Sequence, residues 1–318
     1  MTSEVSVLFV LDPLDELKEP KDSSIAMMRE MARRGHRIWT CEIGGLAWRD
    51  GVVQAVATRL DIVPQGTQWF TRLETARRPL EHFDVVLMRK DPPFDFEYLV
   101  ATYLLEAAVR RGARVFNDPR ALRDHNEKFA IAEFAHYAPP TLVSRDPDAI
   151  REFQAEHGDV VVKPLDGMGG RGVFRLAPQD PNLGVILETA TQSGQRTVMV
   201  QRFIPEIAAG DKRILLVAGR PVPYALARTP RPGESRGNLA AGGIPHAQPL
   251  SERDRAIAAA LGPALADRGL LLVGLDVIGD YLTEINVTSP TCFVEIKRET
   301  GFNVAVMFVE ALERQILQ

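Results

Sequence analysis

A glycine-rich stretch between two apolar runs constrains the fold of this chain more than any other feature. The glycines lie between the β-branched run 160–162 and the apolar run 173–176, and they are Gly167, Gly169, Gly170 and Gly172. The first, second and fourth match the G-x-G-x-x-G spacing, but a dinucleotide-binding fold needs a helix directly afterwards, and the second run favours a strand. No G-x-x-x-x-G-K-[ST] motif occurs, so this is not a P-loop protein.

The glycine stretch therefore predicts a β-hairpin whose loop folds over phosphate groups. Glycine lets backbone N–H groups approach phosphate oxygens without a Cβ in the way. Lys163 ends the first apolar run, where it would reach the phosphates as a point charge. A plain glycine-rich hairpin without a ligand is the alternative.

Three oxygen-bearing side chains lie on two neighbouring apolar runs near the C-terminus. Glu284 and Asn286 are two residues apart on the second run, so they share one face of a strand. Asp276 lies on the preceding run, 272–278. Oxygen ligands of this kind suit Mg²⁺, a hard cation that bridges substrate phosphates. We predict a divalent-metal site here; a polar strand face wetted by solvent is the alternative.

The metal hypothesis sets a condition on the turn between these strands. With a two-residue loop at 279–280, Asp276 would pair with Thr283 and point away from Glu284. With a three-residue loop, 279–281, or an equivalent bulge, Asp276 would sit opposite Glu284. The site therefore requires the longer loop or a bulge.

A further candidate for phosphate binding lies at a predicted helix start. Asn126 can cap a helix that runs to about His136, which would place Lys128 in the first turn. A lysine there opposes the helix dipole, and its position is easier to understand if it serves a ligand. A surface lysine without a ligand is the alternative.

The segment that follows Gly210 supplies charged groups for nucleotide chemistry. Asp211 could accept a hydrogen bond from a ribose hydroxyl. Arg213, and Arg228 in a loop rich in glycine and proline, could stabilise charge on a transferring phosphoryl group. A solvated charged surface is the alternative for the neighbouring Lys212 and Arg231.

Composition narrows the function classes. The chain has 318 residues and a formal net charge of −4, without the basic excess of a nucleic-acid-binding protein. Neither a signal peptide nor a run of about 18 apolar residues is visible, so we expect a cytoplasmic protein that does not bind a membrane. Cys41 and Cys292 are the only cysteines, which excludes a disulfide framework. Cys292 has no nearby histidine in sequence, which favours a small buried residue over a nucleophile.

The order of predicted elements indicates two domains. Strands and helices alternate through the first third, which favours a parallel sheet covered by helices. The expected strands span 5–11, 37–42, 83–88 and 114–117, and the expected helices span 23–34 and 96–111. From about residue 124 the pattern becomes α+β. We predict an α/β domain over 1–123, a second domain over 124–318, and a lid loop over 229–245 within the second domain.

These motifs together resemble the ATP-grasp superfamily and, within it, the prokaryotic glutathione synthetases. The resemblance covers nearly the whole chain, and its anchors keep a consistent order and spacing. They are the segments 88–94, 122–128, 163–170, 236–243, 274–280 and 284–291. The resemblance implies an N-terminal parallel-sheet, pre-ATP-grasp domain followed by an ATP-grasp fold.

The resemblance also implies a role for each candidate residue. Catalysis falls to Arg213 and Arg228. ATP binding falls to Lys128, Lys163, Gly167, Gly169, Gly170, Gly172, Gln201, Arg202, Phe203, Ile204 and Asp211. Peptide-substrate binding falls to Arg89, Lys90, Arg236, Asn238, Ser289 and Thr291. The implied metal ligands are Asp276, Glu284 and Asn286, with Mg²⁺ or alternatively Mn²⁺.

The implied activity is the ATP-dependent joining of γ-glutamylcysteine to glycine through an acyl phosphate, in a homotetramer. Its partners would be these small molecules and ATP, with no nucleic acid and no membrane. One rival is another ATP-grasp carboxylate–amine ligase, which would differ in the segments 89–94 and 236–243. The other is a non-catalytic ATP-binding protein of the same fold.

Overall fold

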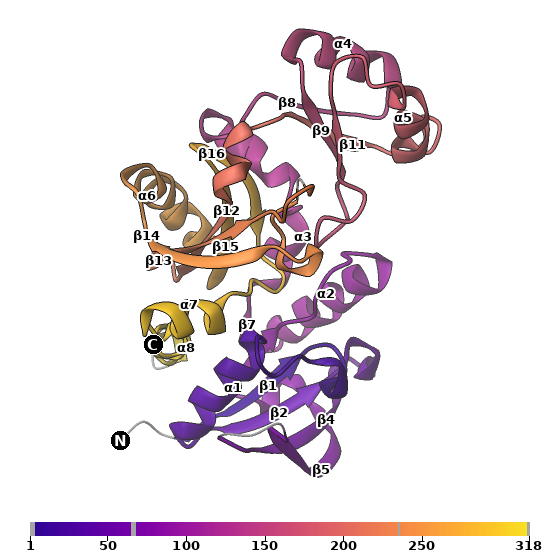
Figure 1. Ribbon diagram of the computed structural model, residues 1–318. Coiled ribbons are helices and arrows are strands. Elements are labelled where there is room, and N and C mark those ends of the chain that lie inside the picture. Colours follow the sequence, from indigo (N-terminus) through magenta and orange to yellow (C-terminus); the bar gives the residue numbers. More distant parts are fainter. Residues whose placement is uncertain (1–3, 65–67, 235, 317–318) are drawn as a thin grey trace.

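Three β-sheets, arranged one above the other, organise the chain (Figure 1). The computed structural model describes residues 4–64, 68–234 and 236–316. The N-terminal sheet lies at the bottom of Figure 1, a five-stranded sheet lies in the middle, and a four-stranded sheet with two helices lies at the top.

The N-terminal sheet contains the predicted parallel core together with three strands that were not predicted. Its order is β3-β4-β2-β1-β6-β7, with β5 also paired to β4. The parallel members are β1 (Ser6–Val10), β2 (Arg37–Cys41), β6 (Val85–Met88) and β7 (Val115–Phe116). The antiparallel members are β3 (Leu46–Arg49), β4 (Val52–Ile62) and β5 (Phe70–Pro79). These three extend the sheet from the β2 edge.

The central strand β1 is apolar because both of its faces are buried. Leu8 and Val10 belong to the core beneath α2 (Phe96–Val109), whereas Val7 and Phe9 belong to the core beneath α1 (Ser23–Arg33). A strand covered on both faces gives a continuous hydrophobic run instead of an alternating one.

The first helix agrees with its predicted bounds and caps. The Asp22 carboxylate accepts a hydrogen bond from Ile25 N at 2.9 Å, and Gly35 follows the helix with φ +87°. A side-chain acceptor at the helix start and a left-handed glycine at its end satisfy backbone groups that would otherwise lack partners.

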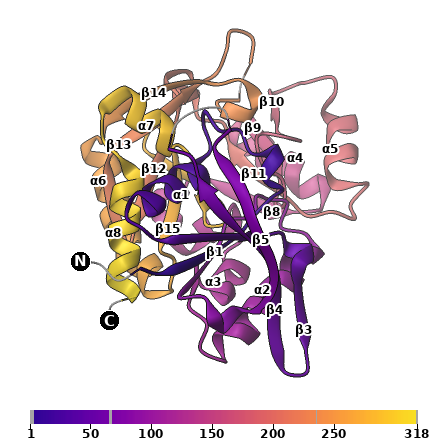
Figure 2. The ribbon, with the colours of Figure 1, turned by 90° about the horizontal axis from the view of Figure 1, so that it is seen from below.

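The five-stranded sheet has the order β14-β13-β12-β15-β16, and every neighbouring pair is antiparallel. Its strands are β12 (Asp211–Val217), β13 (Arg220–Thr229), β14 (Ile244–Pro249), β15 (Leu272–Ile278) and β16 (Tyr281–Asn286). The associated helices are α6 (Glu252–Asp267), α7 (Phe293–Thr300) and α8 (Val304–Ile316). The C-terminal α8 returns beside α1, where Arg34 Nη1 donates to Glu313 Oε2 at 2.7 Å (Figure 2).

The four-stranded sheet has the order β10-β9-β11-β8 and a separate small core. Its elements are β8 (Thr141–Ser144), β9 (Val160–Pro164), β10 (Phe174–Leu176), β11 (Val198–Arg202), α4 (Pro147–His157) and α5 (Leu183–Thr191). The remaining short elements are α3 (Pro119–Asp124) and the 3₁₀ helices η1 (Leu14–Glu16), η2 (Ile43–Gly45), η3 (Leu80–His82), η4 (Phe129–Tyr137), η5 (Pro205–Ala209) and η6 (Leu239–Ala241).

One buried asparagine links the N-terminal sheet to the middle sheet. Asn117 Nδ2 donates to Leu272 O at 2.8 Å and to Val287 O at 2.7 Å, and its Oδ1 accepts from Leu272 N at 2.9 Å.

Across the described ranges, no helix combines the length and apolar character needed to cross a lipid bilayer.

Candidate active site

The hairpin of β15 and β16 places Asp276 directly opposite Glu284. Its turn has only two residues, since Ile278 pairs with Tyr281. A register shift between Asp276 and Val277 leaves Thr283 as an extra residue, and its hydroxyl donates to Asp276 O at 3.2 Å. The condition that the metal hypothesis set, a longer loop or a bulge, is met, and a bulge meets it.

The same register places Asn286 opposite Gly274, two positions along from the Asp276–Glu284 pair. Alternate positions on a strand share a face, so the three predicted metal ligands lie on one side of the hairpin. Asn286 Nδ2 donates to Gly274 O at 3.2 Å, which occupies the amide nitrogen and leaves Oδ1 as the group that can bind a cation.

Two arginines hold the Asp276 carboxylate. Arg213 Nε donates to Oδ1 at 2.5 Å, and Arg228 Nη2 lies 3.0 Å from Oδ2. Burial would raise the pKa of Asp276, but these two guanidinium groups outweigh burial and hold the pKa well below its ordinary value. The carboxylate is therefore ionised at neutral pH.

The positions of both arginines follow from strand register. Arg213 on β12 pairs with Asp276 on β15, and Asp211 pairs with Arg228 across β12 and β13. The sequence-based assignment of Arg228 to a loop was wrong, because β13 continues to Thr229. The signal that was missed is the apolar run 224–227, which continues the strand up to Arg228.

Asp211 is the second buried carboxylate of this network. Arg228 Nη2 donates to its Oδ2 at 2.5 Å, whereas its Oδ1 is buried without a hydrogen-bond partner among the described residues. Burial raises the pKa of Asp211 to about 7, against the opposing effect of Arg228. A ribose hydroxyl could donate a hydrogen bond to this unpaired oxygen. The predicted contact between Asp211 and the ribose stays a prediction.

Two buried lysines converge on Glu284 from different elements. Lys163 Nζ, on β9, lies 3.5 Å from Glu284 Oε1 and donates to Thr283 O at 3.3 Å. Lys128 Nζ lies 3.8 Å from the same carboxylate oxygen and donates to Gly167 O at 2.5 Å. Burial lowers the pKa of Lys163, and the neighbouring Lys128 charge contributes to the same effect.

The capping prediction for this segment is confirmed in part. Asn126 Oδ1 accepts from Phe129 N at 3.0 Å. The helix is a 3₁₀ helix, η4, and it begins at Phe129, so Lys128 lies at its cap and not within its first turn. Lys128 is consequently outside the helix and turned towards the glycine loop.

That glycine loop joins β9 and β10, as predicted for a hairpin between two strands. Gly169, Gly170 and Gly172 have φ of +63°, +78° and +69°, a region that side chains with a Cβ rarely adopt.

The segment 201–204, predicted to bind ATP, lines a cavity of about 100 Å³, hereafter the hinge cavity. Arg202 in this segment is held by Tyr281, whose hydroxyl accepts from Arg202 Nη2 at 2.9 Å. The predicted residues that line the hinge cavity are Lys163, Gln201, Arg202, Phe203, Ile204, Asp211, Arg236, Asn238 and Glu284.

An adjoining cavity of about 140 Å³, hereafter the acyl cavity, shares Asn238 and Glu284 with the hinge cavity. The predicted residues that line it are Gly167, Gly169, Arg213, Arg228, Asn238, Asp276, Glu284, Asn286, Ser289 and Thr291. The two cavities together gather candidate nucleotide, metal and substrate residues from segments more than a hundred positions apart.

Arg89 and Lys90 are absent from the described linings of both cavities. Arg89 is buried, and it donates from Nε to Ser24 Oγ at 3.0 Å and from Nη2 to Pro290 O at 3.0 Å. Lys90 Nζ lies 2.8 Å from Asp12 Oδ1. Arg89 thus holds the chain beside Ser289 in place, which is an indirect contribution to the acyl cavity.

Two charged residues of the acyl cavity were missed by the sequence analysis. Glu127 Oε1 accepts from Val287 N at 2.9 Å, Thr288 N at 3.0 Å and the Thr288 hydroxyl at 2.8 Å. Asp91 lines the same cavity. Both residues lie within segments that carry the family resemblance, and this position was the signal that could have identified them as site residues.

The predicted lid is shorter than expected and is partly structured. Thr229 ends β13, and Ile244 and Pro245 are paired in β14, so the loop proper spans 230–243 and contains η6. Ser235 lies outside the described residues. Arg236 Nη1 donates to Gly170 O at 3.3 Å, which docks the lid on the glycine loop.

Comparisons with known proteins match both parts of the chain. The model for the prokaryotic glutathione synthetase N-terminal domain matches residues 5–123, and the model for the prokaryotic glutathione synthetase ATP-grasp domain matches residues 127–301. A glutathione synthetase of Ralstonia nicotianae is 60% identical over 308 residues, covering 97% of this chain and 95% of the relative. One of Nitrosomonas europaea is 58% identical over 315 residues, covering 98% of each chain.

Solved structures of ATP-grasp enzymes share the fold at low sequence identity. The D-cycloserine synthetase DcsG has a TM-score of 0.67 at 17% identity and covers 98% of this chain and 99% of its own. The ATP-grasp ligase PsnB complexed with minimal precursor has a TM-score of 0.65 at 17% identity, with 98% and 99% covered. At this identity the likeness establishes the fold alone.

Proposed function

The chain belongs to the prokaryotic glutathione synthetase family, and from this membership we propose that it joins γ-glutamylcysteine to glycine with ATP, releasing ADP and phosphate. The observation that carries the proposal is the convergence of two buried lysines on Glu284, in an oxygen-rich hairpin that lines adjoining cavities together with two arginines. A rival ATP-grasp carboxylate–amine ligase would share this machinery and differ in its peptide substrates.

The chemistry requires activation of a carboxylate. A carboxylate oxygen of the cysteine residue attacks the γ-phosphorus of ATP, ADP leaves, and an acyl phosphate forms. The amine of glycine then attacks the acyl carbon, and phosphate leaves. Lys128 and Lys163 would bind the α- and β-phosphates, while Arg213 and Arg228 would face the charge that develops on the transferred phosphoryl group and on the oxyanion.

The donor set of the hairpin fits a divalent cation. Asp276 and Glu284 face each other, Asn286 shares their side, and all the donors are oxygens, which Mg²⁺ prefers. We propose that these three residues hold Mg²⁺ or Mn²⁺. The cation would neutralise phosphate charge. In the absence of nucleotide Glu284 is the one carboxylate that both Lys163 and Lys128 approach, and phosphates that entered with the cation would supply these two lysines with further negative charge.

The same family resemblance leads us to propose a cytoplasmic homotetramer. Sedimentation velocity of the purified protein would test the oligomeric state, and a monomer or dimer at micromolar concentration would contradict it.

The decisive experiment measures ADP release with γ-glutamylcysteine alone, with glycine alone and with both. We expect rapid turnover only with both, with glutathione formed in equal amount to ADP. Lys163→Met, which removes a proposed phosphate ligand, is the control for contaminating ATPase. Release of AMP and pyrophosphate would contradict the acyl-phosphate route, and absence of any turnover would favour the non-catalytic alternative.

A further inference from the structure

The described lining of the acyl cavity contains four acidic residues, and three of them have fixed partners. Two arginines hold Asp276, and two lysines approach Glu284, which is also a proposed metal ligand. One carboxylate oxygen of Glu127 accepts three hydrogen bonds from the residues just after β16. Asp91 is the fourth acidic residue, and the scheme above gives it no role.

The main chain of Asp91 is held on one side, and its carboxylate contacts the cavity wall. Asp91 N donates to Asp12 Oδ2 at 2.9 Å. Lys90 Nζ donates to Asp91 O at 2.8 Å and lies 2.8 Å from Asp12 Oδ1. The Asp91 carboxylate accepts a hydrogen bond from the hydroxyl of Ser289, and both residues line the acyl cavity. Lys90 therefore contributes to the acyl cavity indirectly, by positioning Asp91.

Charged and titratable groups surround Asp91, and they come from its own segment, the end of β1, the start of α1 and α2. They are Asp12, Asp22, Arg89, Lys90 and Tyr98. Burial has the largest effect on Asp91 and raises its pKa, with Asp12 and Asp22 acting in the same direction. The Ser289 hydrogen bond and Arg89 act against this rise. A carboxylate whose pKa is raised accepts a proton more readily than an ordinary one.

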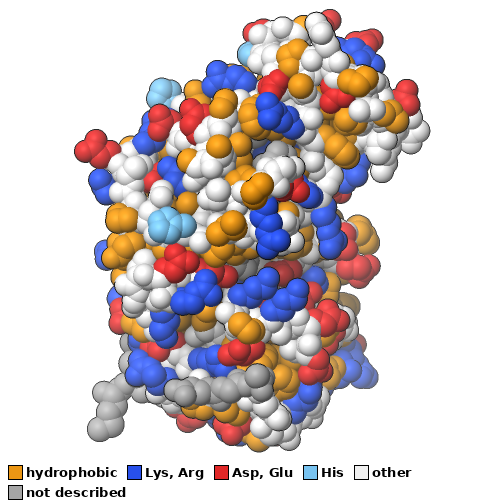
Figure 3. Space-filling view, viewed as in Figure 1, with side chains coloured by type: hydrophobic (Ala, Val, Ile, Leu, Met, Phe, Trp, Pro, Cys, Tyr) orange, Lys and Arg blue, Asp and Glu red, His pale blue; other side chains and the backbone are white. Residues whose placement is uncertain are grey.

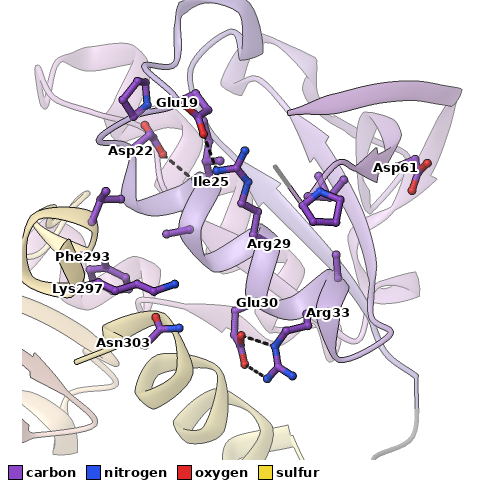
Figure 4. Close-up of a pocket in the computed structure, with 16 residues that line it drawn as sticks. Glu19, Asp22, Ile25, Arg29, Glu30, Arg33, Asp61, Phe293, Lys297 and Asn303 are labelled. Atoms are coloured by element: carbon purple, nitrogen blue, oxygen red, sulfur yellow. Dashed lines mark hydrogen bonds and ion pairs between the residues drawn. The ribbon is translucent and has the colours of Figure 1, made fainter. Parts of the chain in front are cut away.

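Asp22, another carboxylate near Asp91, has a different task. It caps α1, where its side chain accepts from Ile25 N at 2.9 Å. It also lines a separate groove of about 540 Å³, in which Figure 4 shows Glu30 paired with Arg33. The described lining of this groove shares no residue with that of the acyl cavity, so Asp22 is not placed to reach a substrate there.

We propose that the Asp91 carboxylate is the general base that takes a proton from the ammonium group of glycine. The neutral amine then forms a bond to the acyl carbon, the bond from that carbon to the phosphate oxygen breaks, and phosphate leaves. The nitrogen loses two protons in becoming an amide, of which Asp91 takes one and the departing phosphate takes the other. Asp91 is half-buried, so it can return its proton to solvent after the product leaves. This inference rests on the proposed function and deepens it, because it names the group that accepts this proton.

The test compares two acceptors in Asp91→Asn, which keeps the shape of the side chain and removes the base. The amino group of glycine is protonated at neutral pH, whereas hydroxylamine is neutral there and attacks an acyl phosphate without a base. We expect kcat for glutathione formation to fall about 100-fold or more, the usual contribution of a general base. Formation of the hydroxamate from γ-glutamylcysteine, ATP and hydroxylamine should keep the parental rate, because acyl-phosphate formation does not need Asp91.

The pH dependence of kcat with glycine is the second measurement. In the parental protein kcat should fall as pH falls through the raised pKa of Asp91, because the protonated carboxyl group no longer accepts a proton. In Asp91→Asn the residual kcat should rise with pH in proportion to the fraction of glycine whose amine is neutral. A purely structural role of Asp91 would lower the rate without giving this profile.

Asp148→Asn is the control for the loss of an aspartate charge. Figure 3 shows acidic side chains exposed on the domain of the four-stranded sheet, in the upper part of the view. Asp148 belongs to α4 of this domain, and its side chain is 90% exposed. This variant should keep the parental rates with both acceptors at every pH.

Three results with Asp91→Asn would overturn the general base and leave the proposed function standing. An unchanged kcat with glycine would show that another group takes the proton. An equal loss with glycine and with hydroxylamine would assign Asp91 a structural role. A higher KM for glycine at the parental kcat would show that Asp91 only holds the ammonium group. Absence of glutathione synthesis from the parental protein would overturn the proposed function and the general base together.

Discussion

At the residue scale, the site depends on a buried network of two aspartates and two arginines. Asp276 contacts both Arg213 and Arg228, and Asp211 contacts Arg228. Buried charges are expensive unless each has partners, and removal of one partner leaves the others uncompensated. The network therefore holds both guanidinium groups in fixed positions beside the acyl cavity before any substrate arrives.

Asp211 gives this network a pH dependence whose sign follows from its pKa. Burial raises the folded-state pKa to about 7, above the unfolded value of about 4. Between these values the folded protein binds more protons than the unfolded protein, so stability falls as pH rises from 4 to 7. The lowered pKa of Asp276 acts with the opposite sign only at the acid end of this window, because above about pH 5 its carboxylate is ionised in both the folded and the unfolded state.

We therefore expect Asp211→Asn to flatten the stability profile of the nucleotide-free protein between pH 4 and 7. Summed from pH 4 to pH 7, the lost pH dependence should amount to a difference in the free energy of unfolding on the order of a few kcal/mol. Urea unfolding at several pH values measures it. An unchanged slope in Asp211→Asn would show that another group titrates in this window.

Asn286 provides the most specific test of the proposed metal site, because its substitution removes a proposed oxygen ligand without changing the charge. We expect Asn286→Ala to raise the Mg²⁺ concentration for half-maximal activity about 10- to 100-fold or more. Activity titrated with Mg²⁺ and with Mn²⁺ is the measurement. Asn182→Ala, at an exposed helix cap whose side chain makes no capping hydrogen bond, is the control and should titrate as the parental protein does.

At the element scale, the lid and the glycine loop form a pair of contacting segments. A Cβ added to Gly170 would lie 2.8 Å from Asn238 Oδ1 and 3.1 Å from Arg236 Cδ, so a side chain there would displace the lid residues. A lid that closed over the site would keep water from an acyl phosphate, and this is the role that we predict for the contact.

Gly170→Ala and Gly233→Ala form a matched pair for this contact. Their φ values are +78° and +81°, so each should lose about 1–2 kcal/mol from backbone strain. A Cβ on Gly233 meets nothing within 4 Å, whereas a Cβ on Gly170 meets the lid. We expect only Gly170→Ala to lower kcat/KM for γ-glutamylcysteine, by about tenfold or more.

Limited proteolysis supplies the second measurement for this pair. The parental lid should be protected by ATP, Mg²⁺ and γ-glutamylcysteine together, and Gly170→Ala should lose that protection. If the two alanine variants had equal kinetics and equal protection, the contact between the lid and the glycine loop would not contribute to catalysis.

At the scale of the whole molecule, Asn117 joins the N-terminal sheet to the hairpin that carries the proposed metal ligands. Its three hydrogen bonds reach the start of β15 and the residue after β16. Since the surrounding region is buried, loss of this side chain would leave backbone groups without partners.

We expect Asn117→Ala to lower the free energy of unfolding by about 3 kcal/mol or more, since each unsatisfied buried group costs about 1–3 kcal/mol. The half-saturating Mg²⁺ concentration should rise as well, because the hairpin loses an anchor. Denaturant unfolding and Mg²⁺ titration measure the two effects, with Asn182→Ala again as the control. Unchanged stability would show that water replaces the side chain.

The sequence by itself determined the features that depend on nearby residues. Helix caps at Asp22 and Asn126, the glycine hairpin, and the shared face of Glu284 and Asn286 follow from local backbone chemistry and strand periodicity. The parallel core of the first domain likewise follows from alternating strands and helices. The ordered motifs identified the family, which the comparisons confirmed.

Only the tertiary structure decided which distant groups meet. The strands between 46 and 79 join the sheet at its β2 edge, and periodicity within a segment does not specify the edge on which it pairs. The bulge at Thr283, the Asp276–Arg213 contact and the Asp91–Asp12 contact depend on register and packing between elements. These are properties of non-local contacts, and their free energies are set by partners that no short stretch of sequence contains.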